Sequence, residues 1–414
     1  MWALTGLIVA YRVAAEAALR VIEYRPSGSH LGLRDVSATI QQLDLRLQQA
    51  CYWPLQYITL RRQKHDLARL REFHPEYIRF YNSMWLVAND IIIGATIGTY
   101  LIENKQAIVR FVEFCIRDLL TAGLADTIAW LMDWPGGLKL NNELAAFFGE
   151  LFLWVIHFWG SALGHLQPYL PILVHVIGLS GFLGATFAFA LIADLTSLLT
   201  LQIYSCYLSA ARIYNWQVTV LSSLFHLFRG KRRNVLRQRI DSCDYGFDQL
   251  LVGTILFTVL IFLLPTVAVF YAFFAGARFG IILSNAFLES CVMLLNHFPL
   301  FAIMLRLKDP RRVPGGVRID LVDRPARDGV YLTLTPLALP VMAMFQPYFV
   351  LCRQIQQHYL SANMLGLLVG GGLVPIRGSH LYSLQYSMLP SERIPTRTLS
   401  AEILRFAKER TRGK

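Results

Sequence analysis

Apolar residues in this chain are gathered in runs that are long enough to cross a lipid bilayer. A helix needs about 20 apolar residues to span the hydrocarbon core, so these runs predict membrane helices. We therefore predict an all-α polytopic integral membrane protein with about five to six membrane segments. The runs are Trp85–Ile102, Leu144–Gly164, a stretch within Tyr169–Leu208, Leu250–Gly276 and Gly280–Leu305.

The number of crossings before the basic segment at 229–239 stays open. Residues 1–85, 229–239 and 306–414 are basic, which favours the cytosolic side for all three. Three crossings between the first two of these regions would place them on opposite sides. Either 107–124 or part of 169–208 is one more crossing, or one candidate is re-entrant. The stretch 169–208 would reach roughly 60 Å as one helix, so we expect an even number of crossings there.

Glycine and proline spacing adds detail to these predicted helices. The pairs Gly94-x-x-x-Gly98 and Gly160-x-x-x-Gly164 have the spacing that lets two helix backbones approach closely in lipid. We expect these faces to pack against other subunits. Pro265 lies inside an apolar run and predicts a kink.

The regions on either side of the membrane domain have a different character. Met1–Ile22 is predicted to be an amphipathic or anchoring helix. Val317–Val322 and Val330–Leu334 alternate in polarity around Asp328-Gly329, which predicts a β-hairpin. We expect a short interfacial segment at Leu337–Leu351 and a final basic helix at Ala401–Arg410. The predicted regions are 1–85 (N-terminal, cytosolic or interfacial, helical), 86–305 (membrane domain with a cytosolic basic loop near 229–241) and 306–414 (a small, partly β, C-terminal cytosolic region).

Composition supports the membrane interpretation and limits the alternatives. Hydrophobic residues make up 55% of the chain and charged residues 16%, where about 25% charged is usual for a soluble domain. The formal net charge is +12, and the basic residues avoid the apolar runs. The sequence has no nucleic-acid-binding motif, so we interpret the charge as cytosolic loops beside anionic lipid.

Motifs for sugar-transfer chemistry are missing from the sequence. It has no D-x-D pair for a metal-bound diphosphate, no two Glu residues eight apart and no phosphate-binding glycine loop. The cysteines and histidines are scattered without the spacing of a metal site. We therefore expect no catalytic residues, no metal and no cofactor.

Three acidic residues lie inside apolar runs, where a charge is costly and suggests a function. They are Asp90, Asp194 and Glu289; His297 is a weaker candidate. Such residues can bond to neighbouring helices or lie near a helix end. Alternatively, they can line a polar path for a lipid headgroup or a transported substrate.

The basic segment contains six cations in eleven residues. It can serve as a loop that fixes topology, and the same charges can also bind a phosphoinositide headgroup or the acidic face of a partner. Each Lys or Arg near an anionic surface contributes about 1 kcal/mol to binding. The residues are Arg229, Lys231, Arg232, Arg233, Arg237 and Arg239.

Several segments resemble the PIG-Q family, which is subunit Q of the phosphatidylinositol N-acetylglucosaminyltransferase. The longest match covers the basic segment and the apolar run after it, and the resemblance spans roughly residues 36–316. Two departures stand out, because only about 35 residues precede the match and Gln202 stands where a histidine is expected. The segments are Ser223–Ser242, Asp248–Thr266, Gln42–Gln49, Trp53–Tyr57, Trp85-x-x-x-Asn89-Asp90, Gly137–Asn141 and Ala211–Tyr214.

The resemblance implies a multi-pass endoplasmic-reticulum membrane subunit that does not itself catalyse the reaction. The complex moves GlcNAc from UDP-GlcNAc to phosphatidylinositol, the first step of GPI-anchor synthesis. Implied partners are the catalytic PIG-A-type subunit, PIG-C, PIG-H, PIG-P and PIG-Y types, the membrane and phosphatidylinositol, with no nucleic acid. A lipid transporter or scramblase is the alternative. An unfamiliar membrane transferase is the least favoured reading, because no motif supports it.

Overall fold

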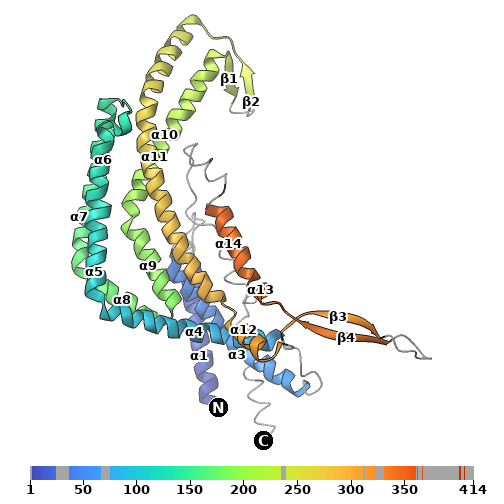
Figure 1. Ribbon diagram of the computed structural model, residues 1–414. Helices are drawn as coiled ribbons and strands as arrows, with labels where there is room; N and C mark the ends of the chain where they lie inside the picture. The colour runs from blue at the N-terminus through green and yellow to red at the C-terminus, as the bar shows by residue number, and fades with distance from the viewer. Residues whose placement is uncertain are drawn as a thin grey trace.

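The protein is built mainly from helices, with two small antiparallel hairpins (Figure 1). The computed structural model describes residues 2–24, 37–66, 75–234, 239–310, 313–322 and 331–359, with single residues 361, 366, 401 and 405. The predicted helix Ala401–Arg410 therefore lies almost entirely outside the described residues.

The elements follow one another with short connections. The first half of the chain contains α1 (Trp2–Glu23), α3 (Ala38–Asp66), α4 (Pro75–Glu103), α5 (Lys105–Phe114), the π-helix η2 (Cys115–Gly123), α6 (Leu124–Met132), the 3-10 turn η3 (Pro135–Gly137), α7 (Asn142–Leu166), the 3-10 turn η4 (Gln167–Tyr169) and α8 (Leu170–Gly181). The second half contains α9 (Ala185–Leu199), α10 (Leu201–Phe228), β1 (Lys231–Asn234), β2 (Arg239–Ser242), α11 (Phe247–His297), α12 (Leu300–Lys308), β3 (Pro314–Val322), β4 (Tyr331–Ala338), α13 (Val341–Met344) and α14 (Gln346–Tyr359).

Three helical segments within the described residues are long and apolar enough to cross a membrane. They are Tyr77–Glu103, Asn142–Gly181 and Phe247–His297. Helices α9 and α10 qualify together as a fourth, although they are bent by 52° at their junction. By length and composition, the structure offers three or four candidates in place of the five to six membrane segments expected from the sequence.

The two predicted spans at Leu250–Gly276 and Gly280–Leu305 are wrong as separate helices, because both lie largely within α11. This single helix has 51 residues and a length of about 76 Å at 1.5 Å per residue. The segment between the predicted spans is flanked by Gly276 and Gly280 and has no proline, and α10 packs against it. The Arg278 guanidinium lies over the Tyr204 ring of α10, 4.8 Å from its centroid.

Helix α11 also continues through Pro265, where a kink was predicted. Proline cannot donate a backbone hydrogen bond, so it weakens the helix one turn before it. The acceptor that loses its helical donor is the Ile261 carbonyl, and the carbonyl next to it, that of Leu260, accepts a hydrogen bond from the buried side chain of Gln217 on α10 (3.0 Å). A side chain from the neighbouring helix thus binds the backbone of the turn that the proline weakens.

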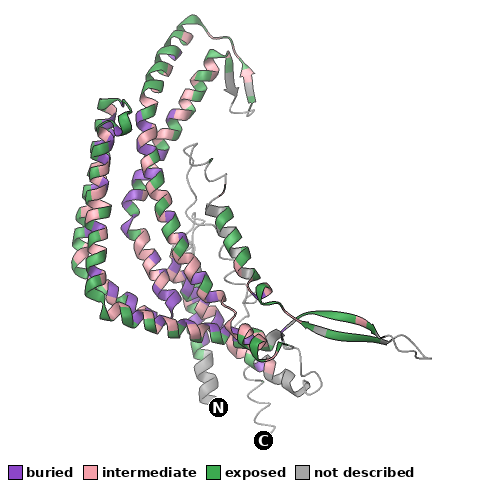
Figure 2. Cartoon of the chain, in the orientation of Figure 1, coloured by how far each residue is buried: buried purple, intermediate pink, exposed green. Residues whose placement is uncertain are grey.

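The largest core cluster joins α6, α7, α10 and α11 through aromatic side chains. Phe152 of α7 packs on Phe274 of α11 with ring centroids 4.5 Å apart. Tyr214 of α10 stacks on Tyr271 of α11 at 4.6 Å. Figure 2 shows the buried residues along the facing sides of these helices, while their outer faces are exposed.

Helices α4 and α8 cross at glycines. A Cβ on Gly94 would lie 2.2 Å from the carbonyl oxygen of Gly181, and one on Gly98 would lie 2.4 Å from that of Gly178. The predicted close approach is therefore present. Its partner is α8 of the same chain, which corrects the expectation that this face packs against another subunit.

The stretch 169–208 is divided at two points. Helix α8 ends at Gly181, and α9 begins at Ala185 after Gly184, whose φ of +147° favours glycine. The second break is the bend between α9 and α10 at Thr200. The stretch is thus not one helix, in agreement with the length argument.

The predicted C-terminal hairpin is confirmed as β3 paired antiparallel with β4. Ile319 lies opposite Leu334, and Leu321 opposite Leu332. The alternation gives the hairpin an apolar face and a polar face, and all four of these apolar residues are exposed. Figure 1 shows the hairpin extending away from the helices.

Candidate functional site

Asp90 lies at the N-terminus of a neighbouring helix. It is on α4 and is 1% exposed. Its carboxylate accepts hydrogen bonds from the backbone N–H of Thr186 (3.0 Å) and from the Thr186 hydroxyl (2.8 Å). Thr186 is the second residue of α9, so the carboxylate satisfies a free N–H and faces the positive end of the helix dipole.

Gly184 makes room for this contact. A Cβ at this position would lie 2.1 Å from Asp90 Oδ2. The φ of +147° is also unfavourable for any residue with a side chain. Gly184 therefore allows both the turn before α9 and the close approach of the carboxylate.

Asp194 caps the N-terminus of α3 in the same manner as Asp90 caps that of α9. It lies on α9 and accepts hydrogen bonds from the backbone N–H groups of Ala38 (2.8 Å) and Thr39 (3.0 Å) at the start of α3. The hydroxyl of Ser37 donates to the same carboxylate (2.5 Å). Asp194 thereby joins α9 to α3.

Arg46 on α3 forms an ion pair with Asp90, so the three helices are joined in a closed circuit of contacts. Its Nη2 lies 2.6 Å from Asp90 Oδ2, and both side chains are largely removed from solvent. The circuit therefore runs from α4 to α9, from α9 to α3 and from α3 back to α4. We define the polar ring as these residues together with the two side chains that attach it to α11 and α3: Arg46, Asp90, Thr186, Asp194, Asn296 and Gln42.

Asn296 brings α11 into the polar ring. Its side-chain oxygen accepts from Arg46 (3.2 Å), and its amide donates to Gln42 of α3 (2.9 Å). Burial lowers the pKa of the Arg46 guanidinium, whereas the adjacent Asp90 carboxylate raises it. Arginine remains charged in proteins, so the pair acts as a buried ion pair with most of its hydrogen bonds satisfied.

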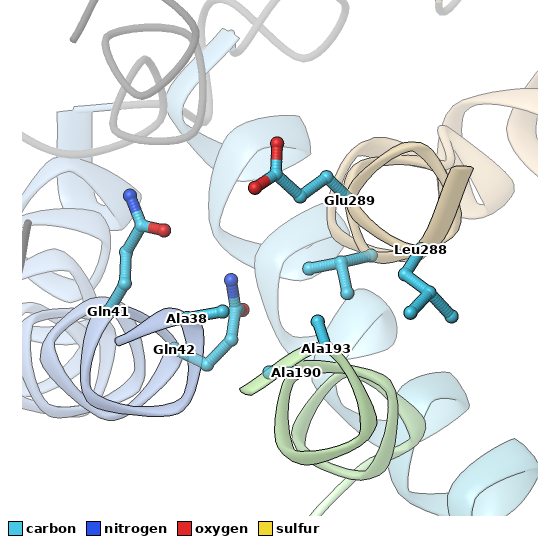
Figure 3. A pocket seen from close by; sticks show the side chains of 8 residues that line it. Ala38, Gln41, Gln42, Ala190, Ala193, Leu288 and Glu289 are labelled. Carbon is cyan, nitrogen blue, oxygen red and sulfur yellow. The ribbon is translucent and has the colours of Figure 1, made fainter. Parts of the chain in front are cut away.

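Glu289 lies beside the ring and lines a small cavity. Gln41 and Gln42 from α3, Ala190 and Ala193 from α9, and Leu288 and Glu289 from α11 surround the space (Figure 3). Its volume of about 10 Å³ is room for about one water molecule. This cavity is therefore too small to admit a lipid headgroup.

The basic segment is a β-hairpin rather than a loop. Lys231 pairs with Ser242 and Asn234 with Arg239, and Arg232 and Arg233 lie between them in β1. Gly230 turns the chain out of α10 with a φ of +60°, and its carbonyl accepts from Cys243 N–H (2.9 Å). We define the basic hairpin as residues 229–242.

Three cations of the basic hairpin lie on its surface, and the side chains of Arg232 and Arg233 are outside the described part of the chain. Arg229, Lys231 and Arg239 are exposed, whereas Arg237 lies outside the described residues. Arg239 forms an ion pair with Asp241 at 2.7 Å. The basic hairpin therefore keeps a positive surface at the far end of the α10–α11 pair, as Figure 1 shows.

Sequence reasoning identified the carboxylates of the ring but missed their partners. Arg46, Thr186 and Asn296 were not singled out, although Arg46 lies within one quoted family segment and Asp90 within another. The substituted position Gln202 is also structural. It is 2% exposed, and its amide donates to the Leu120 carbonyl in the π-helix η2 (2.5 Å).

Comparison with known proteins gives the family. The model of the family described as "N-acetylglucosaminyl transferase component (Gpi1)" matches residues 40–315. The chain belongs to the Gpi1 family. All members of the polar ring and the whole basic hairpin lie inside the matched region.

Two yeast relatives of the Gpi1 family align over most of this chain. The protein named "N-acetylglucosaminyl-phosphatidylinositol biosynthetic protein gpi1" from Schizosaccharomyces pombe is 44% identical over 95% of this chain and 61% of its own length. "Phosphatidylinositol N-acetylglucosaminyltransferase subunit GPI1" from Saccharomyces cerevisiae is 37% identical over 90% of this chain and 64% of its own length. The chain thus spans less than two thirds of either relative.

The resemblance to mammalian Gpi1-family proteins covers less of the chain. "Phosphatidylinositol N-acetylglucosaminyltransferase subunit Q" from Mus musculus is 37% identical over 61% of this chain and 43% of its own length. No solved structure matches the chain. Within the described part of the chain, no three His, Cys, Asp or Glu side chains gather where they could hold a metal ion.

Proposed function

We propose that this protein is a non-catalytic membrane subunit of the complex that transfers GlcNAc from UDP-GlcNAc to phosphatidylinositol, the first step of GPI-anchor synthesis. The observation that carries the proposal is the family match over residues 40–315, together with yeast relatives aligned over 95% and 90% of the chain. The Saccharomyces cerevisiae relative is named as a subunit of this transferase.

The arrangement of polar residues supports a scaffolding role. The buried carboxylates Asp90 and Asp194 bind the N-termini of α9 and α3, and Arg46 pairs with Asp90. These groups hold helices together. The catalytic chain would be a PIG-A-type subunit, and the other partners would be PIG-C, PIG-H, PIG-P and PIG-Y types.

We place the protein in the endoplasmic-reticulum membrane as a multi-pass subunit. The proposed regions are residues 1–85, 86–305 and 306–414. Because α11 is one continuous helix, a single crossing by it places the basic hairpin and residues 306–414 on opposite sides of the membrane. We place the basic hairpin on the cytosolic side, because clusters of Lys and Arg remain on that side. This orientation brings its positive surface to the leaflet in which the anionic inositol lipid would be glycosylated.

The basic hairpin would face either the catalytic subunit or the inositol lipid. The test is a pull-down of the tagged chain from mild detergent, assayed for transfer of GlcNAc to phosphatidylinositol. The variant replaces Lys231, Arg232 and Arg233 with Ala. A matched control replaces Lys105, Arg110 and Arg117, which are exposed cations on α5 and η2, and changes the net charge equally.

The wild type and the control should recover a glycosyltransferase and activity. Loss of the catalytic subunit from the hairpin variant would make the hairpin a docking surface. Retention of that subunit with reduced transfer would make it a lipid-facing surface. A wild-type chain recovered alone and inactive, under conditions that preserve other membrane complexes, would refute the proposed function.

A further inference from the structure

A groove lies between the last turns of α10 and the basic hairpin. Its volume is about 490 Å³, which is within the range of small-molecule sites. Its polar lining comes from α10, from the start of β1 and from the segment before α11. These residues are Thr219, Ser222, Ser223, His226, Lys231 and Tyr245; aliphatic side chains complete the wall.

The hydroxyl oxygens of Thr219 and Ser223 on α10 are available as hydrogen-bond acceptors. Thr219 donates its proton to the Asn215 carbonyl (2.7 Å), and Ser223 donates to the Thr219 carbonyl (2.9 Å). Each oxygen therefore faces a ligand with lone pairs only, because its single proton is already engaged. Acceptors one helical turn apart favour a ligand that carries several O–H groups.

The opposite side of the groove favours an anion. Lys231 contributes an ammonium group, and no carboxylate lines the groove among the described residues. His226 Nδ1 is shielded from solvent and meets no hydrogen-bond partner in the described part of the chain. Lysine commonly binds phosphate as a point charge.

Exposed apolar side chains lie on α10 and at the start of α11. Phe225 and Trp216 on α10 are exposed, as are Phe247 and Leu251 on α11. Large exposed apolar surface at the end of a membrane-spanning helix pair suits acyl chains. The ligand that fits both regions is amphiphilic, with a polar head in the groove and tails along the helices.

We propose that this groove binds the headgroup of a phospholipid that carries both a phosphate and several hydroxyl groups. Lys231 holds the phosphate, while Thr219 and Ser223 accept from the hydroxyls. The inference deepens the proposed function and rests on it for the identity of the lipid, since phosphatidylinositol has this headgroup chemistry. The groove then holds the acceptor lipid beside the catalytic subunit.

The test measures binding by the purified full-length chain in detergent. The probes are short-chain phosphatidylinositol, short-chain phosphatidylserine, glycerophosphoinositol and inorganic phosphate. Phosphatidylinositol should bind most tightly, because it alone offers the phosphate, the ring of hydroxyls and the acyl chains. Glycerophosphoinositol should bind more weakly, which separates the lipid source from the free headgroup.

Two variants separate the charge from the hydroxyl contacts. Lys231→Ala should weaken the binding of both phospholipids about tenfold, because it removes a charge-assisted contact. Thr219→Val with Ser223→Ala should weaken the binding of phosphatidylinositol about tenfold and leave the binding of phosphatidylserine unchanged. The matched control is Thr254→Val with Thr258→Val, which removes exposed α11 hydroxyls with the same backbone hydrogen bonds outside the groove.

The proposal would be overturned if Thr219→Val with Ser223→Ala weakened the binding of both lipids equally, or if no groove variant weakened binding. A further variant, Ser223→Trp, fills the groove with a large side chain. It should abolish phosphatidylinositol binding while the thermal unfolding midpoint stays at the wild-type value. Loss of an acidic catalytic subunit from Lys231→Ala with unchanged lipid binding would assign the groove to protein docking instead. A chain that joins the complex yet binds no phosphatidylinositol keeps the proposed function and refutes only this inference.

Discussion

Arg46 Nη2 lies 2.6 Å from Asp90 Oδ2 and joins two family segments that are 44 residues apart in the chain. The same carboxylate binds the first turn of α9. One buried ion pair therefore positions three helices, and Asn296 extends the contact to α11. Charge in the apolar part of this protein is used to fix how helices meet.

Asp90→Asn should destabilise the protein strongly. The substitution leaves the Arg46 guanidinium buried without its counter-ion, which costs about 3–5 kcal/mol when a buried pair is broken. Thermal unfolding in detergent would show a large fall in the midpoint. Asp133→Asn, at an exposed carboxylate, is the matched control. An Asp90 variant as stable as wild type would show that the pair does not stabilise the fold.

Asp194→Ala should have a smaller and more local effect. The variant removes the cap from α3, and loss of an N-cap typically costs about 1 kcal/mol. Hydrogen exchange should become faster at the amides of Ala38 and Thr39, which donate to Asp194. The peptide containing α14 should exchange as before. Unchanged protection at the start of α3 would contradict the capping role.

Glycine positions should divide into two groups. Gly94→Ala and Gly181→Ala place a Cβ within 2.5 Å of a backbone oxygen of the facing helix, so α4 and α8 must move apart. Overpacking of this kind costs about 1–3 kcal/mol. Gly164→Ala and Gly276→Ala meet nothing within 4 Å and should leave the unfolding midpoint unchanged or raise it. Equal effects in the two groups would refute the close crossing.

Gln217→Leu and Gln202→Leu should each lower stability. The first removes the side-chain donor to the Leu260 carbonyl near Pro265, and the second removes the side-chain donor to the Leu120 carbonyl in η2. Loss of one such hydrogen bond costs about 0.5–1.5 kcal/mol. Equilibrium unfolding of the two variants can be compared with Gln106→Leu, at an exposed glutamine. Wild-type stability in Gln217→Leu would mean that this hydrogen bond does not stabilise α11 near Pro265.

Patterns that are local in sequence were the ones that could be predicted. The β3–β4 hairpin followed from alternating polarity around Asp328-Gly329, and the α4 span from an apolar run of sufficient length. The close glycine approach in α4 was predicted, but its partner was not. Nothing in the spacing of Gly94 and Gly98 states whether the facing helix belongs to the same chain.

The remainder depends on contacts between distant segments. Arg46 looked like one cation in a polar helix, and Asn296 lies 250 residues away from it. The continuity of α11 across Gly276 and Gly280 depends on packing against α10, which no periodicity within α11 reveals. The basic hairpin was missed because its strands lack alternating apolar residues, the usual signal for a strand.

The unbroken α11 makes distant parts of the protein mechanically dependent. Its residue Gly253 packs near Leu227 below the basic hairpin, and its residue Asn296 is held in the polar ring. These two points are separated by about 65 Å of helix, so a tilt of about 5° at one end displaces the other by about 6 Å. The helix works as a stiff lever, so the position of the basic hairpin depends on how α3, α4 and α9 pack around Arg46.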